Sequence, residues 1–316
     1  SEDFFKFRPN DKDYIYSDDN SAFIAYKVRR GTAMAVGNPV GNPKAYENVI
    51  NNYINFCEKH AFTPSFVHVS DKLKNLYQKL GFNLQKIGEE AVVDAEKFVE
   101  ETARNKNWRN VKNRFEKQGY KFEMRLPPHS TTFLDEIKRI SDDWLESPGR
   151  TERGFVLGYF DEEYLSNCEI GVLSNEESQL VGFVNLIESF DDTEANMDLF
   201  RQREKSLTNT TDYMMYSLIF ELQTRGCKKF NLGLCPLAGM NDEDEGGTLS
   251  KALSLIYNFG GKLYSFKGLY RFKSKFDPDW RDSYIAYKSS AIGILKIAQS
   301  LSVAMKVDNA KLPRKK

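Results

Sequence analysis

Residues 265–280, SFKGLYRFKSKFDPDW, combine basic and aromatic side chains in a way that could serve an anionic substrate. Aromatic side chains favour burial, whereas ammonium and guanidinium groups resist it. One interpretation is a half-buried element whose long basic side chains extend to water. The other is a pocket floor that offers positive charge to a ligand. The stretch holds these four cations and five rings: Lys267, Arg271, Lys273, Lys275, Phe266, Tyr270, Phe272, Phe276 and Trp280.

A carboxylate and a guanidinium lie three residues apart in NMDLFRQ, at the end of a predicted strand. Asp198 and Arg201 could project from this strand terminus into one cleft, where ligands commonly bind in open α/β sheets. The alternative is an Asp–Arg ion pair at a strand end, with no ligand.

Three further charged residues are candidates for a substrate pocket. Glu152 and Arg153 precede GFVLGYF, where they could close one wall of the pocket or form a surface salt bridge. Asp212 stands at the start of the helical pattern TDYMMY, where it could bind substrate or cap the helix.

A basic segment, ARNKNWRNVKNRFEKQGYKFEMR, lies between two α/β patterns. On a helical wheel Trp108, Val111 and Phe115 form one stripe. Four cations point largely away from that stripe: Lys106, Arg109, Arg114 and Lys117. They form either a solvated helix face or a surface that contacts the phosphate backbone of RNA or lipid head groups.

The composition limits the class of protein. Lysine and arginine total 45, which equals the total of aspartate and glutamate, so any polyanion must bind a local patch. The four cysteines and three histidines are scattered, so we expect no metal site, and a reducing cytoplasm is the simplest setting. No apolar run could span a bilayer. Because the chain begins with Ser1, we expect it to be an excised piece, with any membrane anchor preceding it.

Strand-like and helix-like runs alternate in both halves of the chain, which predicts two related α/β units. The pattern SAFIAYKV, GTAMAV, a helix over PKAYENVINNYINFCEKHA and the strand PSFVHVS recurs later as strands, the helix TDYMMYSLIFELQTRGC and the strand KKFNLGL. Pro127-Pro128 interrupts both helix and strand. We therefore expect a first domain over residues 1–127, ending in the basic helix and strand, and a second over 128–316 with a basic tail.

Several motifs in this order and spacing resemble the cytosolic catalytic region of the multiple peptide resistance factor family, the phosphatidylglycerol lysyltransferases and alanyltransferases. They are GNPVG, RGFVLGYFDEEYL, MDLFRQ, FNLGLCPLAG and FKGLYRFKSKFDPDW, and the resemblance extends from about Phe5 to Lys288. It implies an α/β fold of two tandem GNAT-type acyltransferase domains with mixed central sheets. It also implies transfer of lysine or alanine from aminoacyl-tRNA to the glycerol hydroxyl of phosphatidylglycerol, with no cofactor. An N-terminal transmembrane region would hold such a domain at the cytoplasmic face of the bacterial membrane.

The resemblance also implies roles for the candidate residues. Asp198 is expected to hold the donor ammonium or to orient the hydroxyl, and Arg201 to grip phosphate by its planar fork. Lys273 is expected to point inward from a helix over 269–276 and to stabilise an oxyanion or a phosphate. Four residues are expected to contribute to substrate binding: Glu152, Arg153, Asp212 and Arg271.

Other functions remain open. An acyl-CoA-dependent enzyme is disfavoured, because RQREKSLTNTTDY lacks the glycine-rich loop that cradles pyrophosphate. A Fem-type peptidoglycan aminoacyltransferase would share the tandem fold, the tRNA donor and an FKxxF stretch. A non-catalytic module could bind tRNA or anionic membrane through residues 104–125. The acidic segment MNDEDEGG, residues 240–247, could attract a lysyl side chain or be a solvated loop.

Overall fold

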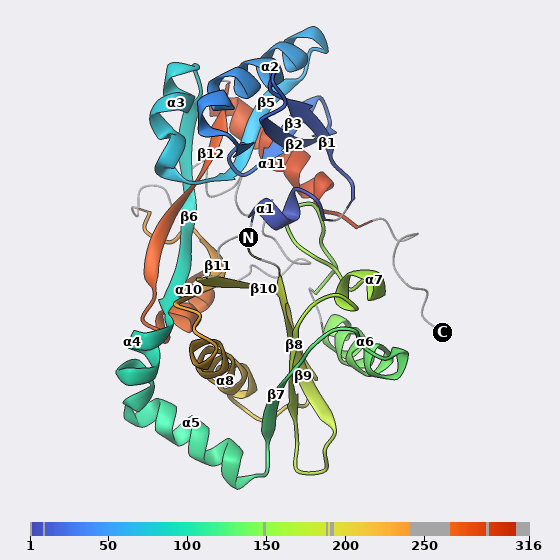
Figure 1. The fold of residues 1–316 in the computed structure, drawn as a ribbon, viewed down its shortest axis with the longest axis vertical. Coiled ribbons are helices and arrows are strands. Elements are labelled where there is room, and N and C mark those ends of the chain that lie inside the picture. Colours follow the sequence, from blue (N-terminus) through green and yellow to red (C-terminus); the bar gives the residue numbers. More distant parts are fainter. Residues whose placement is uncertain are drawn as a thin grey trace.

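A computed structural model describes residues 2–8, 10–147, 150–187, 189, 193–240, 266–288 and 291–307 of the chain. Figure 1 shows an elongated molecule, with the elements of the first 90 residues at the top and the helices α5, α6 and α8 below. Residues 241–247 of the acidic segment and the basic end, 308–316, lie outside the described residues.

The first part of the chain forms strands and helices where the sequence predicts them. The helix over residues 46–59 buries the predicted face, including Val49, Tyr53 and Cys57. The elements are: α1 Glu2–Phe5, β1 Asp13–Tyr16, β2 Ala22–Arg29, β3 Thr32–Val36, β4 Val40–Gly41, η1 Pro43–Ala45, α2 Tyr46–Lys59, β5 Thr63–Val69, η2 Asp71–Leu73, α3 Lys74–Lys79 and β6 Asn83–Asp94.

The second part repeats the pattern of antiparallel strands, a crossover helix and a parallel strand. A helix connects the parallel pair in each part, α2 between β3 and β5, and α8 between β10 and β11. The elements are: α4 Ala95–Glu100, η3 Thr102–Arg104, α5 Lys106–Lys117, β7 Lys121–Arg125, α6 Thr131–Glu146, α7 Glu162–Leu165, β8 Ile170–Ser174, β9 Leu180–Ile187, β10 Glu194–Gln202, α8 Thr210–Thr224, β11 Lys229–Pro236, α10 Phe266–Ser274, β12 Asp279–Tyr287 and α11 Ala291–Ala304.

The described strands form one mixed 12-stranded sheet, in the order β1-β2-β3-β5-β12-β6-β11-β10-β9-β8-β7, with β4 beside β2. The two parts meet where β6 pairs antiparallel with β11. A sequence-based division into two separate sheets therefore differs from the structure, because β6 is long enough to pair with strands of both parts.

The linear division at residue 127 also differs from the packing. β12 comes from the end of the chain, yet it pairs with β5 and β6. α11 packs on β2 and β3, as Figure 1 shows near the top of the molecule. In the opposite direction, α4 and α5 pack against α8. Each unit is therefore completed by a segment that the sequence places in the other one.

Helices cover both faces of the sheet. α2 and α3 pack over the first part, and α4, α5 and α8 pack over one face of the second part. On the other face, one apolar cluster runs through both parts and joins α6, α7 and α11. This continuous core fixes the two parts relative to each other.

The two helices that carry the basic candidates form as predicted. Asn105 caps α5 by accepting a hydrogen bond from the backbone N of Trp108, 3.0 Å away. Trp108 and Phe115 are buried, which leaves the opposite face to solvent. The helix expected over 269–276 forms with shifted bounds, since α10 spans Phe266–Ser274 and the buried Phe276 lies just beyond its end.

Across the described ranges, every helix is too short or too polar to cross a bilayer.

A fragment of residues 1–127 should not fold cooperatively on its own. It lacks β12, which is one of the two partners of β5, and it lacks both partners of β6, which are β12 and β11. It also lacks α11, so the apolar faces of β2 and β3 would be exposed to water. Urea titration followed by circular dichroism should show a broad, non-cooperative change for the fragment and a sigmoidal transition for the whole chain. A sharp transition for the fragment would contradict this packing argument.

Candidate functional site

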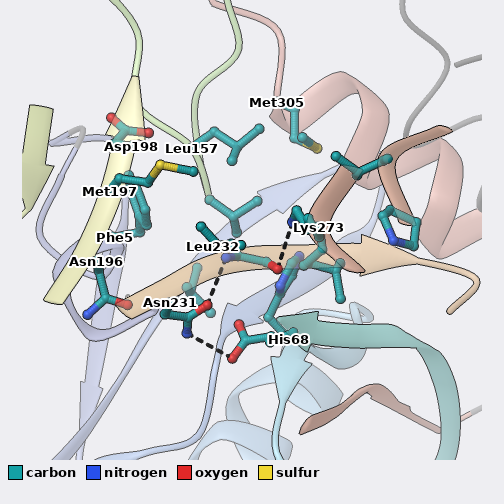
Figure 2. A pocket seen from close by; sticks show the side chains of 17 residues that line it. Phe5, His68, Leu157, Asn196, Met197, Asp198, Asn231, Leu232, Lys273 and Met305 are labelled. Atoms are coloured by element: carbon teal, nitrogen blue, oxygen red, sulfur yellow. Dashed lines mark hydrogen bonds between the residues drawn. The ribbon is translucent and has the colours of Figure 1, made fainter. Parts of the chain in front are cut away.

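A cavity of about 220 Å³ lies between β10, β11 and α10. Its walls are mainly apolar, with Phe5, Met197, Leu232 and Leu269 among the lining residues. Figure 2 shows Asp198 entering from β10 and Lys273 entering from α10. Of the three residues to which the sequence analysis gave a role at the reacting groups, Asp198 and Lys273 line this cavity and Arg201 does not.

Asp198 owes its orientation to a β-bulge. The pairing of β10 with β9 shifts register between Met197 and Phe200, so that Asp198 and Leu199 together oppose one residue. The backbone N of Leu199 donates to the Asn185 side chain, at 2.9 Å. Because of the extra residue, Asp198 and Arg201 both contact the elements on the α6 and α7 side of the sheet.

Two donors fix the Asp198 carboxylate. The Gly158 N–H donates to Oδ1 at 2.9 Å, and the Tyr164 hydroxyl donates to Oδ2 at 3.0 Å. Burial raises the pKa of Asp198 to about 6, against the opposing effect of these two hydrogen bonds. A Cβ at position 158 would lie 1.6 Å from Asp198 Oδ2, so only glycine permits this approach.

Lys273 is buried, and two backbone carbonyls hold its ammonium. Nζ donates to Gly233 O at 2.8 Å and to Leu234 O at 2.9 Å. Burial lowers the pKa of Lys273 to about 8, although Cys235 and Glu90 favour its charged form. The lysine therefore lies inside the molecule beside a cavity, and its described partners are carbonyl groups.

Arg201 does not line this cavity. Its guanidinium binds Glu152 in a bidentate arrangement, with N–O distances of 2.9 and 2.6 Å, and also donates to Ser141. It lies 5.1 Å from the centre of the Trp144 ring. Both partners of the pair are almost fully buried. The sequence analysis assigned the Arg201 guanidinium to a phosphate, but in the structure it pairs with Glu152. Glu152, which was expected in a pocket wall, is therefore the partner of a buried ion pair.

The other predicted substrate-binding residues also lie outside the cavity lining. Asp212 is buried in the first turn of α8 and accepts hydrogen bonds from Lys275 Nζ at 2.9 and 2.8 Å. Asn209 is the N-cap of that helix. Arg153 is half-buried, and burial lowers its pKa. Arg271 is exposed on α10, the helix that carries Lys273.

The four basic residues of α5 form an exposed surface at the end of the molecule away from α2 and α3 (Figure 1). Lys112 of the same helix pairs with Glu116, whereas no salt bridge within the described part of the chain involves the four: Lys106, Arg109, Arg114 and Lys117. We call these four residues the α5 basic surface.

A second, polar cavity of about 1030 Å³ adjoins the first. The two share His68, Glu90, Asn196 and Asn231, which we call the polar partition. His68 lies within β5 and has a positive φ of 62°, at the bulge where the register of β5 against β12 shifts between Val67 and Val69. In the described residues, no three His, Cys, Asp or Glu side chains come together as metal ligands would.

The sequence analysis missed Tyr164, Gly158 and the polar partition. One signal was available in the sequence. Asn196 and Asp198 are two residues apart on a predicted strand, with apolar residues on either side of each, so both side chains are expected on one face of the sheet. Glu90 and Asn231 come from strands far apart in the chain, and only the pairing of β6 with β11 shows that they are neighbours.

Replacing Tyr164 with phenylalanine should raise the pKa of Asp198 further. The variant removes a donor that stabilises the charged carboxylate, and such a hydrogen bond is worth about one pKa unit or more. Carboxyl ¹³C NMR titration would measure the shift. Tyr46→Phe is the matched control, because its hydroxyl donates to Gly41 O elsewhere. An Asp198 pKa that stays the same in Tyr164→Phe would show that the tyrosine does not support the carboxylate.

Known proteins resemble this chain over most of its length. Phosphatidylglycerol lysyltransferase from Bacillus subtilis (strain 168) is 32% identical over 295 residues, which are 93% of this chain and 33% of that protein. Its namesake from Staphylococcus aureus (strain MSSA476) is 28% identical over 297 residues, 94% of this chain and 35% of that protein. The chain spans about a third of the length of these relatives.

Solved structures confirm the predicted fold. L-PGS from Bacillus licheniformis superposes with a TM-score of 0.81 at 29% identity, covering 93% of this chain and 90% of that one. FemX, at 11% identity, gives a TM-score of 0.57 over 94% of this chain and 97% of that one, and supports the fold alone. The α/β class with two tandem GNAT-type units is therefore confirmed. The family model described as phosphatidylglycerol lysyltransferase, C-terminal, matches residues 4–287, and the chain belongs to that family.

Proposed function

We propose that this chain is the catalytic part of an enzyme that transfers an aminoacyl group from aminoacyl-tRNA to the glycerol hydroxyl of phosphatidylglycerol. The family membership supports the reaction class. The observation that carries the proposal is a single cavity faced by a carboxylate with a raised pKa, Asp198, and by a buried ammonium, Lys273.

The two groups suit the two halves of an ester exchange. The glycerol oxygen bonds to the ester carbonyl carbon while Asp198 accepts the hydroxyl proton. Negative charge develops on the carbonyl oxygen, and the Lys273 ammonium stabilises it. The bond to the tRNA ribose oxygen then breaks, and that oxygen leaves with the proton held by Asp198. The products are an aminoacyl ester of the lipid and a deacylated tRNA.

Arg201 and Glu152 act in this proposal as positioning residues. Their buried pair fixes the strand on which Asp198 stands, and Glu152 also accepts a hydrogen bond from the backbone N of Phe160, at 3.2 Å. Arg271 is the candidate for the lipid phosphate, because it is exposed on the helix that supplies Lys273. Leu157 lines the cavity and is itself 38% exposed, which offers an apolar surface near the entrance.

The donor tRNA is proposed to contact the α5 basic surface. Exposed cations on one helix face bind a phosphate backbone by charge, without reading sequence. The acceptor lipid would place the domain at the cytoplasmic face of the bacterial membrane, with an N-terminal region of the whole protein as its anchor. The modification would change the charge of that membrane.

The alternatives receive less support. A Fem-type peptidoglycan enzyme shares the fold, but the family that matches residues 4–287 is the lipid one. A non-catalytic binding module would not need a buried lysine beside a cavity, because burying a charge is costly.

Lys273→Met should lower the rate of transfer from charged tRNA to phosphatidylglycerol vesicles by about 100-fold or more, as loss of an oxyanion donor does. Binding of charged tRNA should persist. Lys267→Met is the matched control, since Lys267 is an exposed cation of the same helix. Transfer at an undiminished rate in Lys273→Met would remove the proposed role.

The pH dependence follows from the same pair. Activity requires Asp198 ionised and Lys273 protonated, so kcat/KM should rise through a pH of about 6 and fall through about 8. In Tyr164→Phe, the acidic limb should move to higher pH because the carboxylate loses a stabilising donor.

Replacing all four residues of the α5 basic surface with alanine should weaken tRNA binding and reduce its salt dependence. Each lost phosphate contact should lower the slope of log K against log salt by about 0.7 to 0.9. Filter binding over a salt series measures both effects. The matched control replaces four exposed cations at the other end of the molecule with alanine: Arg30, Lys44, Lys59 and Lys74. Equal loss in both variants would argue against a local tRNA surface.

A further inference from the structure

Two lysines are buried beside one aromatic ring in the core that joins the two parts of the molecule. Lys12 and Lys27 belong to the first part, whereas Phe155 precedes α7 in the second. Lys12 Nζ lies 5.3 Å and Lys27 Nζ 5.7 Å from the centre of the Phe155 ring. The ring is fully buried, and the side chains of the two lysines are 0% and 9% exposed. We call these three residues the Phe155 clamp.

One carboxylate serves both ammonium groups of the clamp. Asp11 accepts from Lys12 Nζ at 2.8 Å, and its other oxygen accepts from Lys27 Nζ. Lys12 also donates to Arg8 O at 3.3 Å. Lys27 also donates to Ala304 O at 3.2 Å. The cluster therefore joins the N-terminal segment, β2 and the end of α11.

Burial of these charges is costly. It lowers the pKa of Lys12 to about 8, although Asp11 favours the charged form of the lysine. Replacing a buried ion cluster with apolar side chains of similar volume is often neutral or stabilising. A contribution to stability alone therefore does not explain two ammonium groups at this position. Cations beside a ring fix its orientation as well, because they are attracted to the face of the ring.

The backbone at Phe155 has an unfavourable conformation. Its φ is 70°, a value that suits glycine rather than a residue with a bulky side chain. The backbone N of Val156 donates to Gly154 O at 3.0 Å, which closes a three-residue γ-turn around Phe155. A γ-turn with positive φ is strained, and it persists only where its surroundings hold it. One such contact is the Gly154 N–H, which donates to Met305 O at 2.8 Å.

This turn leads directly to the carboxylate of the candidate site. Val156 and Leu157 line the cavity (Figure 2). The next residue, Gly158, donates its N–H to Asp198 Oδ1 at 2.9 Å. Because a hydrogen bond weakens steeply as its angle departs from linearity, the orientation of the Phe155 turn decides whether this donor meets the carboxylate.

We propose that the Phe155 clamp positions the Gly158 N–H against the Asp198 carboxylate. Lys12 and Lys27 are then positioning residues, which act on the carboxylate through the ring and the turn. The inference rests on the proposed function only for the role of Asp198 as proton acceptor. It gives the first part of the chain a share in the chemistry of the second.

Other groups also act on the Asp198 carboxylate. The titratable and charged ones come from the loop before α7, from α7 and the residues just after it, and from β10: Glu152, Tyr164, Cys168 and Arg201. All four lie outside the Phe155 clamp. Loss of the Gly158 donor would raise the pKa of Asp198, because this hydrogen bond stabilises the charged form.

A double-mutant cycle separates the position of the turn from direct effects of charge. Phe155→Leu removes the ring without changing any charge, and Lys27→Met removes one ammonium. Each variant should raise the pKa of Asp198 by about one unit in carboxyl ¹³C NMR titration of the whole chain. The double variant should show no further rise, because both changes act through the same ring. Rises that add up, or an unchanged pKa in Phe155→Leu, would overturn the proposal.

The matched control uses a lysine and a ring elsewhere in the molecule. Lys288 Nζ lies 5.1 Å from the centre of the Phe82 ring, which is also buried. Phe82→Leu and Lys288→Met should leave the pKa of Asp198 as it is in the original chain. A rise of the same size in these variants would point to a general loosening of the structure, against the proposal.

A second measurement follows the hydrogen bond itself. The Gly158 amide proton should change its chemical shift as Asp198 titrates, and this change should shrink in Phe155→Leu and in Lys27→Met. If Lys27→Met fails to fold, Lys12→Met takes its place in the cycle. If Phe155→Leu fails to fold, the Gly158 amide decides in the lysine variants, and an undiminished change there would overturn the proposal.

The pH dependence of transfer separates this proposal from the proposed function. In each clamp variant, the acidic limb of kcat/KM should move to higher pH together with the pKa of Asp198. If the pKa rises and the limb stays, Asp198 is not the proton acceptor, so the proposed function fails and the clamp stands on the NMR data. If the limb moves while the pKa stays, the clamp does not act through Asp198 and the proposal is wrong.

Discussion

The site depends on a buried ammonium held by two consecutive backbone carbonyls. In a regular strand, successive carbonyls point to opposite sides, so one side chain cannot meet both. In β11 the register against β6 shifts between Asn231 and Leu234, and Gly233 takes a φ of 79° that favours glycine. The shift turns the carbonyls of Gly233 and Leu234 towards Lys273. Burial of the charge is thus made possible by one glycine bulge, which also places the lysine beside the cavity.

A second bulge, in β10, lies on the Asp198 side of the cavity and is held by a network of hydrogen bonds. Asn185 accepts from the extra residue of β10 through its oxygen and donates to the Tyr164 hydroxyl, at 2.9 Å in each case. The same hydroxyl donates to Asp198. The polar side chains of this hydrogen-bond network therefore all have partners, as a low-dielectric interior requires. Asn185 links the bulge to the carboxylate. Its oxygen accepts the hydrogen bond of the bulged Leu199 N–H, and its NH₂ orients the Tyr164 hydroxyl that donates to Asp198.

The sequence predicted features set by local pattern. The helix around Lys273, the buried stripe of α5 and the pairing of a carboxylate with a strand end follow from residue spacing within a few turns. It could not predict that Glu152 would occupy the fork of Arg201, because the two are 49 residues apart. The insertion of β12 between β5 and β6 is also a non-local pairing that no window of sequence displays. The contacts of two lysines with the Phe155 ring are likewise visible only in the folded chain.

Asp198 and Lys273 do not form a direct ion pair with each other in the described part of the chain, since Asp198 accepts from Gly158 and Tyr164 while Lys273 donates to two backbone carbonyls. A close pair would lower the pKa of the carboxylate and raise that of the ammonium. Here burial moves both pKa values the other way, to about 6 and about 8, and the charges that act on each come from other residues. The Asp198 carboxylate and the Lys273 ammonium therefore do not fill the space between them by pairing with each other. A substrate carbonyl group placed there would have the Asp198 carboxylate, a proton acceptor, on one side and the Lys273 ammonium on the other. The partial charges of the ester would then interact favourably with both groups and offset the cost of burying their charges.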